Sequence, residues 1–233
     1  MVHGMDRPTP KRHKKSASRR STATSVPPLG QRERNKLEKL HRIRDAASAL
    51  FKERGFDRTT TLAIAELADI GEGTLFLYAR TKEDLLALVM ETELTETVRK
   101  ASASVPSHAS LPVQALHVFT RLLRYHSRNK ELSKYFVRQN TIPRRLKSRS
   151  RVVPLVTLII DAMTTIVAED QRRKSVRSDV VASDIGWCLF SIYYGALARF
   201  LNGEASLERS ISYLKRSFTF LFEGLQFPGR AGR

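Results

Sequence analysis

Apolar residues recur every three or four positions from residue 31 onward, which is the period of an amphipathic helix. The first such segment, 31–54, places them between charged residues. Gly55 follows at the position where a left-handed residue commonly ends a helix. No sustained alternation of β-branched and polar residues indicates a strand anywhere in the chain. The pattern therefore predicts an all-α fold.

Two short helices are predicted directly after the first one. Thr60 can cap a helix that starts at the next residue, residues 69–71 form a tight turn, and a third helix spans about 72–77. Thr81 then restarts the chain as an N-cap, with Asp84 three residues on, as in a capping box. Two short helices joined by a tight turn are typical of a helix-turn-helix, whose second helix enters the major groove of DNA.

The remainder of the chain is predicted to be helical as well. The expected helices are 81–103, 110–127, 130–139, 151–173, 178–202 and 205–226. We divide the chain into a disordered basic arm at 1–30, a helix-turn-helix DNA-binding domain at 31–80, and a helical effector-binding and dimerisation domain at 81–233. The arm is rich in Pro, Ser and Thr and cannot bury enough apolar surface to offset its ordering entropy. It is either an inert tail or a segment that contacts DNA.

The last two predicted helices carry more apolar surface than one core can cover. Helix 178–202 is apolar on two faces, so both must be buried, and one of them can meet a second copy of the chain. A fully internal helix in a monomer is the alternative. The residues assigned to a homodimer interface are Ile185, Leu189, Ile192, Ala196, Leu207, Ile211, Leu214 and Phe218.

The net charge of the chain indicates which class of partner it binds. The chain has 41 Lys and Arg against 23 Asp and Glu, a net charge of +18, which favours nucleic acid or, less often, an anionic membrane surface. Residues 143–151 hold five of the basic residues, in a solvated loop or in a site for an acidic effector or a second DNA segment.

Several functional classes are excluded by what the sequence lacks. The histidines form no pair at metal-binding spacing, and Cys188 is the one cysteine, interpreted as a small buried hydrophobe. We expect no metal, no cofactor and no enzyme activity. The longest uncharged apolar stretch, 185–198, is shorter than the roughly 20 residues of a membrane span. With no secretory signal visible, a cytoplasmic protein without a membrane partner is expected.

Residues 39–89 resemble the TetR family of bacterial transcriptional regulators. The matching residues are Ile43, Ala46, Ala47, Leu50, Phe51, Gly55, Phe56, Thr59, Thr60, Ile64, Ala65, Ala68, Ile70, Gly73, Thr74, Leu75, Tyr78, Lys82, Glu83, Leu85 and Leu86. The resemblance implies that Glu72, Gly73, Thr74, Leu75 and Leu77 lie on or beside the recognition helix. It also implies that Tyr78 and Lys82 contact DNA phosphates, and that Thr60 and Thr61, at the start of the second helix, contact the DNA backbone.

The sequence also departs from the family pattern. The departures are Ala63, Asp69, Gly71, Phe76 and Ala79. Asp69 tolerates the left-handed conformation that the turn needs, whereas the small Ala79 leaves less packing between the DNA-binding head and the body. Glu72 either accepts a hydrogen bond from a cytosine amino group or points to solvent.

The resemblance implies a repressor that a small-molecule effector releases from a palindromic operator on double-stranded DNA. The alternative is a DNA-binding protein of the same fold without a ligand. Residues that could line an effector pocket are His117, Phe119, Tyr125, His126, Phe136, Trp187 and Tyr193. Aromatic residues at helical spacing are also common in an ordinary core, and Trp187 could equally serve the dimer.

Overall fold

The computed structural model describes residues 1, 30–141 and 152–224, and within these ranges it contains helices and no strand. The helices are α1 Gln31–Arg58, α2 Thr61–Leu67, α3 Glu72–Tyr78, α4 Lys82–Ala103, α5 Leu111–Arg128, α6 Lys130–Thr141, α7 Val152–Arg172, α8 Ala182–Leu201 and α9 Leu207–Glu223. The predicted all-α fold is confirmed. The predicted arm and the basic segment 143–151 lie almost entirely outside the described residues.

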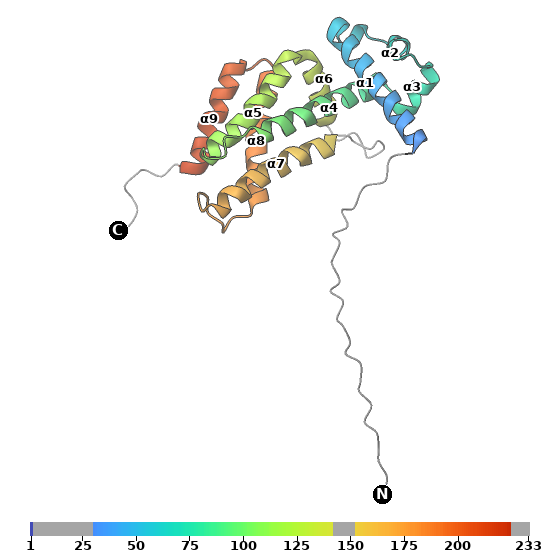
Figure 1. Ribbon diagram of the computed structural model, residues 1–233. Coiled ribbons are helices and arrows are strands. Elements are labelled where there is room, and N and C mark those ends of the chain that lie inside the picture. Colours follow the sequence, from blue (N-terminus) through green and yellow to red (C-terminus); the bar gives the residue numbers. More distant parts are fainter. Residues whose placement is uncertain (2–29, 142–151, 225–233) are drawn as a thin grey trace, which may run out of the picture.

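The molecule consists of a small head and a larger helical body (Figure 1). Helices α1, α2 and α3 form the head, and α4 runs from the head into the body, where it packs on α5 and α7. Helices α8 and α9 lie side by side in the body, α8 against α7 and α9 against α5. This arrangement makes α4 a direct mechanical link between the two parts.

The head forms around the apolar stripe of α1. Ile43, Ala47, Leu50 and Phe51 are buried, as the periodicity predicted, and they meet the buried residues of α2 and α3. Gly55 has a φ of 78°, the left-handed conformation expected of a helix-ending glycine. The regular helix is therefore interrupted at Gly55, directly after the predicted end at residue 54, and a further helical turn beyond this kink reaches Arg58.

Helices α2, α3 and α4 begin where the sequence predicted them, and capping side chains fix the starts of α2 and α4. The hydroxyl of Thr60 accepts a hydrogen bond from the backbone N–H of Ala63, and that of Thr81 accepts one from Asp84. Asp69 takes a φ of 52°, which confirms that the turn tolerates this residue in left-handed geometry. Gly71 begins α3 without a side-chain cap.

Close packing of α7 on α8 depends on a glycine. A Cβ added to Gly186 would lie 2.8 Å from the Oγ1 of Thr164 and 3.2 Å from the backbone oxygen of Ile160. The Thr164 hydroxyl oxygen is itself buried without a hydrogen-bond partner among the described residues. A side chain at residue 186 therefore has to push the two helices apart.

We expect Gly186→Ala to destabilise the protein by about 1–3 kcal/mol, the usual cost of overpacking a core. Chemical denaturation of the two proteins measures the change in the free energy of unfolding. The double variant Gly186→Ala/Thr164→Ala should recover much of the loss, because Thr164 supplies the nearest obstructing atom. A Gly186→Ala protein as stable as the parent would contradict this packing.

Candidate functional site

The outward surface of α3 is apolar. Leu77 is 84% exposed and Phe76 is 43% exposed, while Leu75 is completely buried in the core of the head. The expectation that Leu75 contacts DNA is therefore wrong, because its side chain has no surface to offer. Phe76, one of the departures from the family pattern, lies on the surface. Gly73 is exposed, with open space around its Cα, and Thr74 is half-buried.

A hydrogen bond joins the first turns of α2 and α3. The hydroxyl of Thr61 donates to a carboxylate oxygen of Glu72 over 3.1 Å. In the DNA-free structure Glu72 thus has a protein partner, an arrangement that neither sequence interpretation of this residue considered. The bond fixes the first turn of α3 relative to the start of α2.

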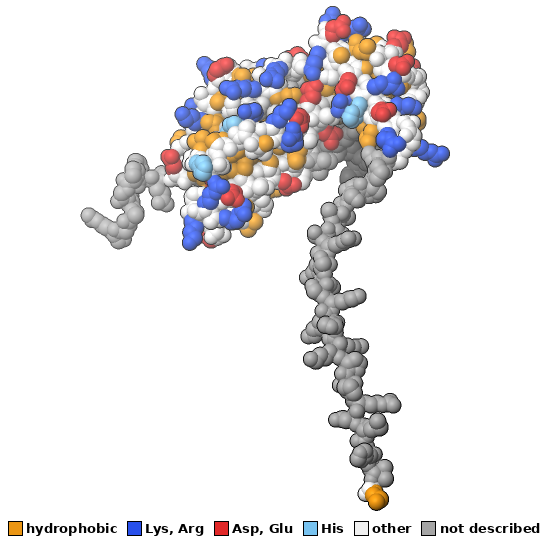
Figure 2. All heavy atoms as spheres, in the orientation of Figure 1, with side chains coloured by type: hydrophobic (Ala, Val, Ile, Leu, Met, Phe, Trp, Pro, Cys, Tyr) orange, Lys and Arg blue, Asp and Glu red, His pale blue; other side chains and the backbone are white. Residues whose placement is uncertain are grey.

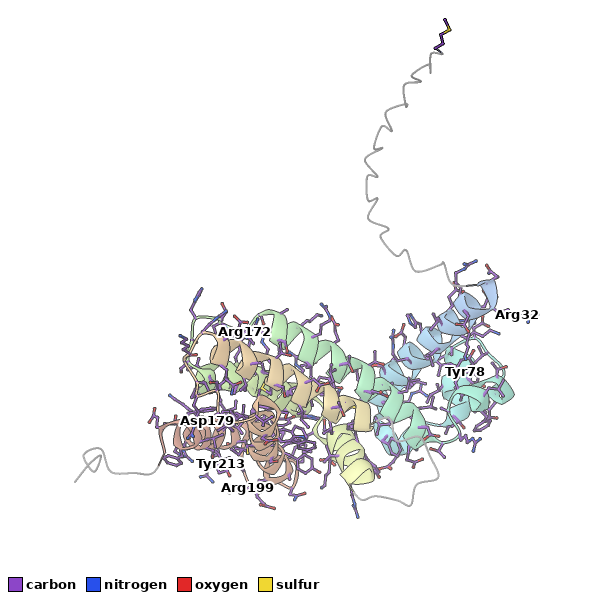
Figure 3. The ribbon with its side chains drawn as sticks, turned by 90° about the horizontal axis from the view of Figure 1, so that it is seen from below. Arg32, Tyr78, Arg172, Asp179, Arg199 and Tyr213 are labelled. Carbon is purple, nitrogen blue, oxygen red and sulfur yellow. The ribbon has the colours of Figure 1, made fainter. Side chains whose placement is uncertain are left out.

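The two residues expected to contact DNA phosphates lie at the end of α3 and the start of α4. Tyr78, labelled in Figure 3, is half-buried and packs against the core. The Lys82 ammonium donates to the backbone oxygen of Asp57 over 3.1 Å and sits 4.5 Å from the centre of the Phe56 ring. Lys82 therefore already holds the end of α1, and a phosphate has to share or replace that contact. Basic side chains are otherwise scattered over both head and body on the face shown in Figure 2.

The head meets the body at the end of α1 and the middle of α6. The Phe56 and Tyr135 rings have centres 4.5 Å apart, and the Tyr135 hydroxyl donates to a carboxylate oxygen of Asp57 over 2.9 Å. This hydrogen bond to Asp57 raises the pKa of Tyr135. Ala79 is buried at the end of α3. The aromatic pair thus supplies head-to-body packing beyond the small side chain of Ala79.

A second junction forms around Glu93 of α4. Its carboxylate accepts hydrogen bonds from Lys52 at 2.8 Å and Ser48 at 3.0 Å, both on α1, and from Tyr125 of α5 at 3.0 Å. Partial burial acts to raise the pKa of Glu93, but these donors outweigh it, so the pKa is lowered. Burial, with the nearby Glu93 charge, raises the pKa of Tyr125. A charged Glu93 therefore ties the head, α4 and α5 together.

An apolar cavity of about 270 Å³ lies within the body. Its lining residues are Leu94, His126, Phe136, Val137, Leu155, Val156, Ile159, Phe190, Tyr193, Tyr194 and Leu197. Three of the seven residues expected to line a pocket, His126, Phe136 and Tyr193, are among them. The other lining residues are mostly aliphatic side chains of α4, α6, α7 and α8, together with the aromatic Phe190 and Tyr194, and none of them was expected.

The other four expected pocket residues lie elsewhere. His117 contacts Ser104 through Nε2 at 3.1 Å, and Phe119 is fully buried with its ring centre 4.7 Å from that of Tyr193. Tyr125 belongs to the Glu93 junction, and Trp187 is 53% exposed on α8. These positions remove them from the cavity lining.

Among the described residues, His126 is the one imidazole in the cavity lining. Its Nδ1 lies 3.0 Å from the hydroxyl oxygen of Ser133, and both side chains are buried. Burial lowers the pKa of His126 to about 3, so the ring is neutral at physiological pH. The cavity therefore presents an uncharged, mostly hydrocarbon surface with one imidazole.

The residues expected at a dimer interface face mostly inward. Leu189, Ala196, Leu214 and Phe218 are buried in the protomer's own core, and Ile185, Ile192, Leu207 and Ile211 are partly buried against it. Both apolar stripes of α8 are thus largely buried within the protomer, as the alternative of an internal helix implies. The exposed apolar side chains on these helices are Trp187, Phe220 and Leu221, and Cys188, expected to be buried, is exposed beside Trp187.

Two negative findings hold for the part of the chain that the structure describes. No group of histidine, cysteine, aspartate and glutamate side chains there could hold a metal ion. No helix there combines the length and the apolar character that crossing a bilayer requires.

Comparisons with known proteins agree with this geometry. Residues 43–89 match the model of "Bacterial regulatory proteins, tetR family". Over 73 residues the chain is 33% identical to the uncharacterized HTH-type transcriptional regulator YhgD of Bacillus subtilis (strain 168), a match that covers 30% of this chain and 38% of that protein. The chain thus matches well under half the length of this relative.

Solved structures share the fold over most of the chain. One is Thermus thermophilus FadR, a TetR family transcriptional repressor in complex with lauroyl-CoA, with a TM-score of 0.64, 23% identity and coverage of 83% of this chain and 98% of that one. Another is FadR of Bacillus subtilis in complex with stearoyl-CoA, with a TM-score of 0.60, 15% identity and coverage of 80% and 99%. Residues 43–89 thus form a segment that matches the tetR family of bacterial regulatory proteins, and the chain as a whole shares the fold of solved TetR-family structures.

Proposed function

We propose that this protein is a transcriptional repressor that binds a palindromic operator as a homodimer and is released by an apolar small-molecule effector. One observation carries the proposal: α4 and α6 each line the cavity and also hold the head. On α6, Tyr135 contacts the head while Phe136 lines the cavity. On α4, Glu93 contacts the head while Leu94 lines the cavity.

This adjacency gives a physical route from cavity to DNA. A helix moves largely as a rigid body, so an effector that displaces Phe136 or Leu94 also displaces Tyr135 or Glu93. The head then turns relative to the body, and in a dimer the spacing of the two α3 helices changes. The effector shifts the population only by as much as it favours one arrangement over the other.

The homodimer is proposed to form through the outward faces of α8 and α9. The exposed side chains of Trp187, Phe220 and Leu221 offer apolar surface that a second copy can cover. A two-fold dimer places its recognition helices about 34–36 Å apart, one turn of DNA, which suits a palindrome. These three exposed residues replace, as proposed dimer contacts, the buried and partly buried residues that the sequence analysis assigned to the interface.

An acyl chain is the effector class that the cavity suits best. The lining is almost wholly hydrocarbon, and the two FadR structures of the same fold hold lauroyl-CoA and stearoyl-CoA. A ligand-independent DNA-binding protein has no use for such a cavity, so the alternative function is less well supported. Each methylene that enters the cavity contributes about 0.8 kcal/mol.

The test starts with selection of bound DNA from a random pool, which should return a palindrome. Adding lauroyl-CoA or stearoyl-CoA is expected to weaken binding to that operator by about 5- to 150-fold, the usual range of allosteric coupling. Tyr135→Phe keeps the ring on Phe56 but removes the hydrogen bond to Asp57, so it should reduce this change. Tyr213→Phe on α9 is the control. Operator affinity that no acyl-CoA alters would contradict an acyl effector.

A further inference from the structure

The recognition helix of this protein has no side chain suited to hydrogen-bonding a base in a bidentate manner. Its sequence, EGTLFLY, contains no Arg, Lys, Asn or Gln, the residues that read guanine or adenine in that way. The Glu72 carboxylate is engaged by Thr61, and Leu75 is buried. The exposed surface of α3 is therefore predominantly hydrocarbon.

The exposed hydrocarbon lies on one face of α3. Gly73, Phe76 and Leu77 occupy positions i, i+3 and i+4, which are neighbours on a helix surface. Gly73 leaves open space beside them, so this face can approach DNA closely. With 84% of Leu77 exposed, the free protein pays the cost of hydrating that side chain until a partner covers it.

The major groove offers one apolar group, the C5 methyl of thymine. Covering Leu77 with this methyl removes hydrocarbon from water on both molecules, which is favourable. The other three bases lack this methyl group, so the same side chain buries less hydrocarbon against them.

We propose that α3 reads the operator through thymine methyl groups, which Leu77 and Phe76 contact in each half-site. The inference rests on the proposed function, since it assumes that α3 enters the major groove. It assigns base preference to hydrocarbon contacts and leaves hydrogen bonds from the head chiefly to the phosphates, which fix register without specifying sequence. Thr74, half-buried beside them, can support the same contact through its methyl group.

Deoxyuridine provides the direct test, because it lacks only the methyl group and pairs with adenine as thymine does. The full-length protein is titrated with its selected operator and with copies in which single thymines are replaced. Each contacted methyl is expected to contribute about fourfold in affinity, and a symmetric pair about 15-fold. Thymines outside the half-sites should show no effect.

Protein variants separate this readout from general DNA binding. Leu77→Ala leaves the core of the head intact, since the side chain is exposed, and should abolish the thymine-over-deoxyuridine preference at the thymines that Leu77 contacts. Leu67→Ala, an exposed leucine of α2, is the matched control and should keep it. Equal affinity for thymine and deoxyuridine operators, or a selected operator with only G·C pairs facing α3, overturns the inference alone. Failure to bind any DNA overturns the proposed function.

Discussion

Replacing Val156 by phenylalanine is expected to abolish the effector response while leaving operator affinity unchanged. Val156 belongs to α7 and lines the cavity of about 270 Å³, so a benzyl group there occupies the space that an acyl chain needs. We expect the apparent affinity for lauroyl-CoA to fall by about 100-fold or more, equivalent to about 2.8 kcal/mol. The residue is remote from α2 and α3, so the surface that meets DNA is unaltered.

Operator binding titrated with lauroyl-CoA measures this effect. Val113→Phe is the matched control, because Val113 is an exposed residue at the start of α5 outside the cavity lining. It should respond to the acyl-CoA as the parent does. A Val156→Phe protein with an undiminished response would place the effector somewhere other than this cavity.

Acidification is expected to destabilise the protein through His126. Burial holds the folded-state pKa of this histidine at about 3, whereas the unfolded chain takes up a proton near its ordinary value of 6.5. The unfolded state therefore binds more protons between these values, and stability falls as the pH drops from 6.5 toward 3. Between pH 7 and pH 5 the loss from this one group should be about 2 kcal/mol.

Denaturation curves at pH 7 and pH 5 for the parent and for His126→Gln check this expectation. The variant lacks the titrating ring, so its stability should change less over that interval, by about 2 kcal/mol. His108→Gln, at an exposed histidine, is the control and should retain the parent's pH dependence. The interval stops at pH 5 because Glu93, whose pKa is also lowered, adds a loss of the same sign in stronger acid. Parallel curves for parent and His126→Gln would contradict the assignment.

Local sequence signals predicted the helices well, because their causes are local. Thr60 and Thr81 cap the helices that follow them, and Asp69 takes the left-handed turn, as expected. Periodicity likewise identified Ile43 and Leu50 as buried. Periodicity did not show whether a second copy or the protomer itself covers the two apolar faces of α8, and both Leu189 and Leu197 are buried within the protomer.

The candidate site depends on contacts that no local pattern encodes. Asp57 and Tyr135 are 78 positions apart in the sequence, and their hydrogen bond depends on how α6 packs against the head. The cavity is similar, since Leu94 and Val156 become neighbours only through tertiary packing. On α3, Leu75 and Leu77 are the same residue type two positions apart, and only the tertiary packing of the head shows which is buried.

The adjacency of Tyr135 and Phe136 on α6, and of Glu93 and Leu94 on α4, has a consequence for how such a regulator diverges. A substitution in α4 or α6 that changes the shape of the cavity for a new effector also alters a helix that holds the head in its orientation relative to the body. Under the proposed function, effector range and tightness of repression are therefore linked traits. A descendant that acquires a different effector through α4 or α6 is then expected to need a compensating change at the end of α1 to restore tight repression.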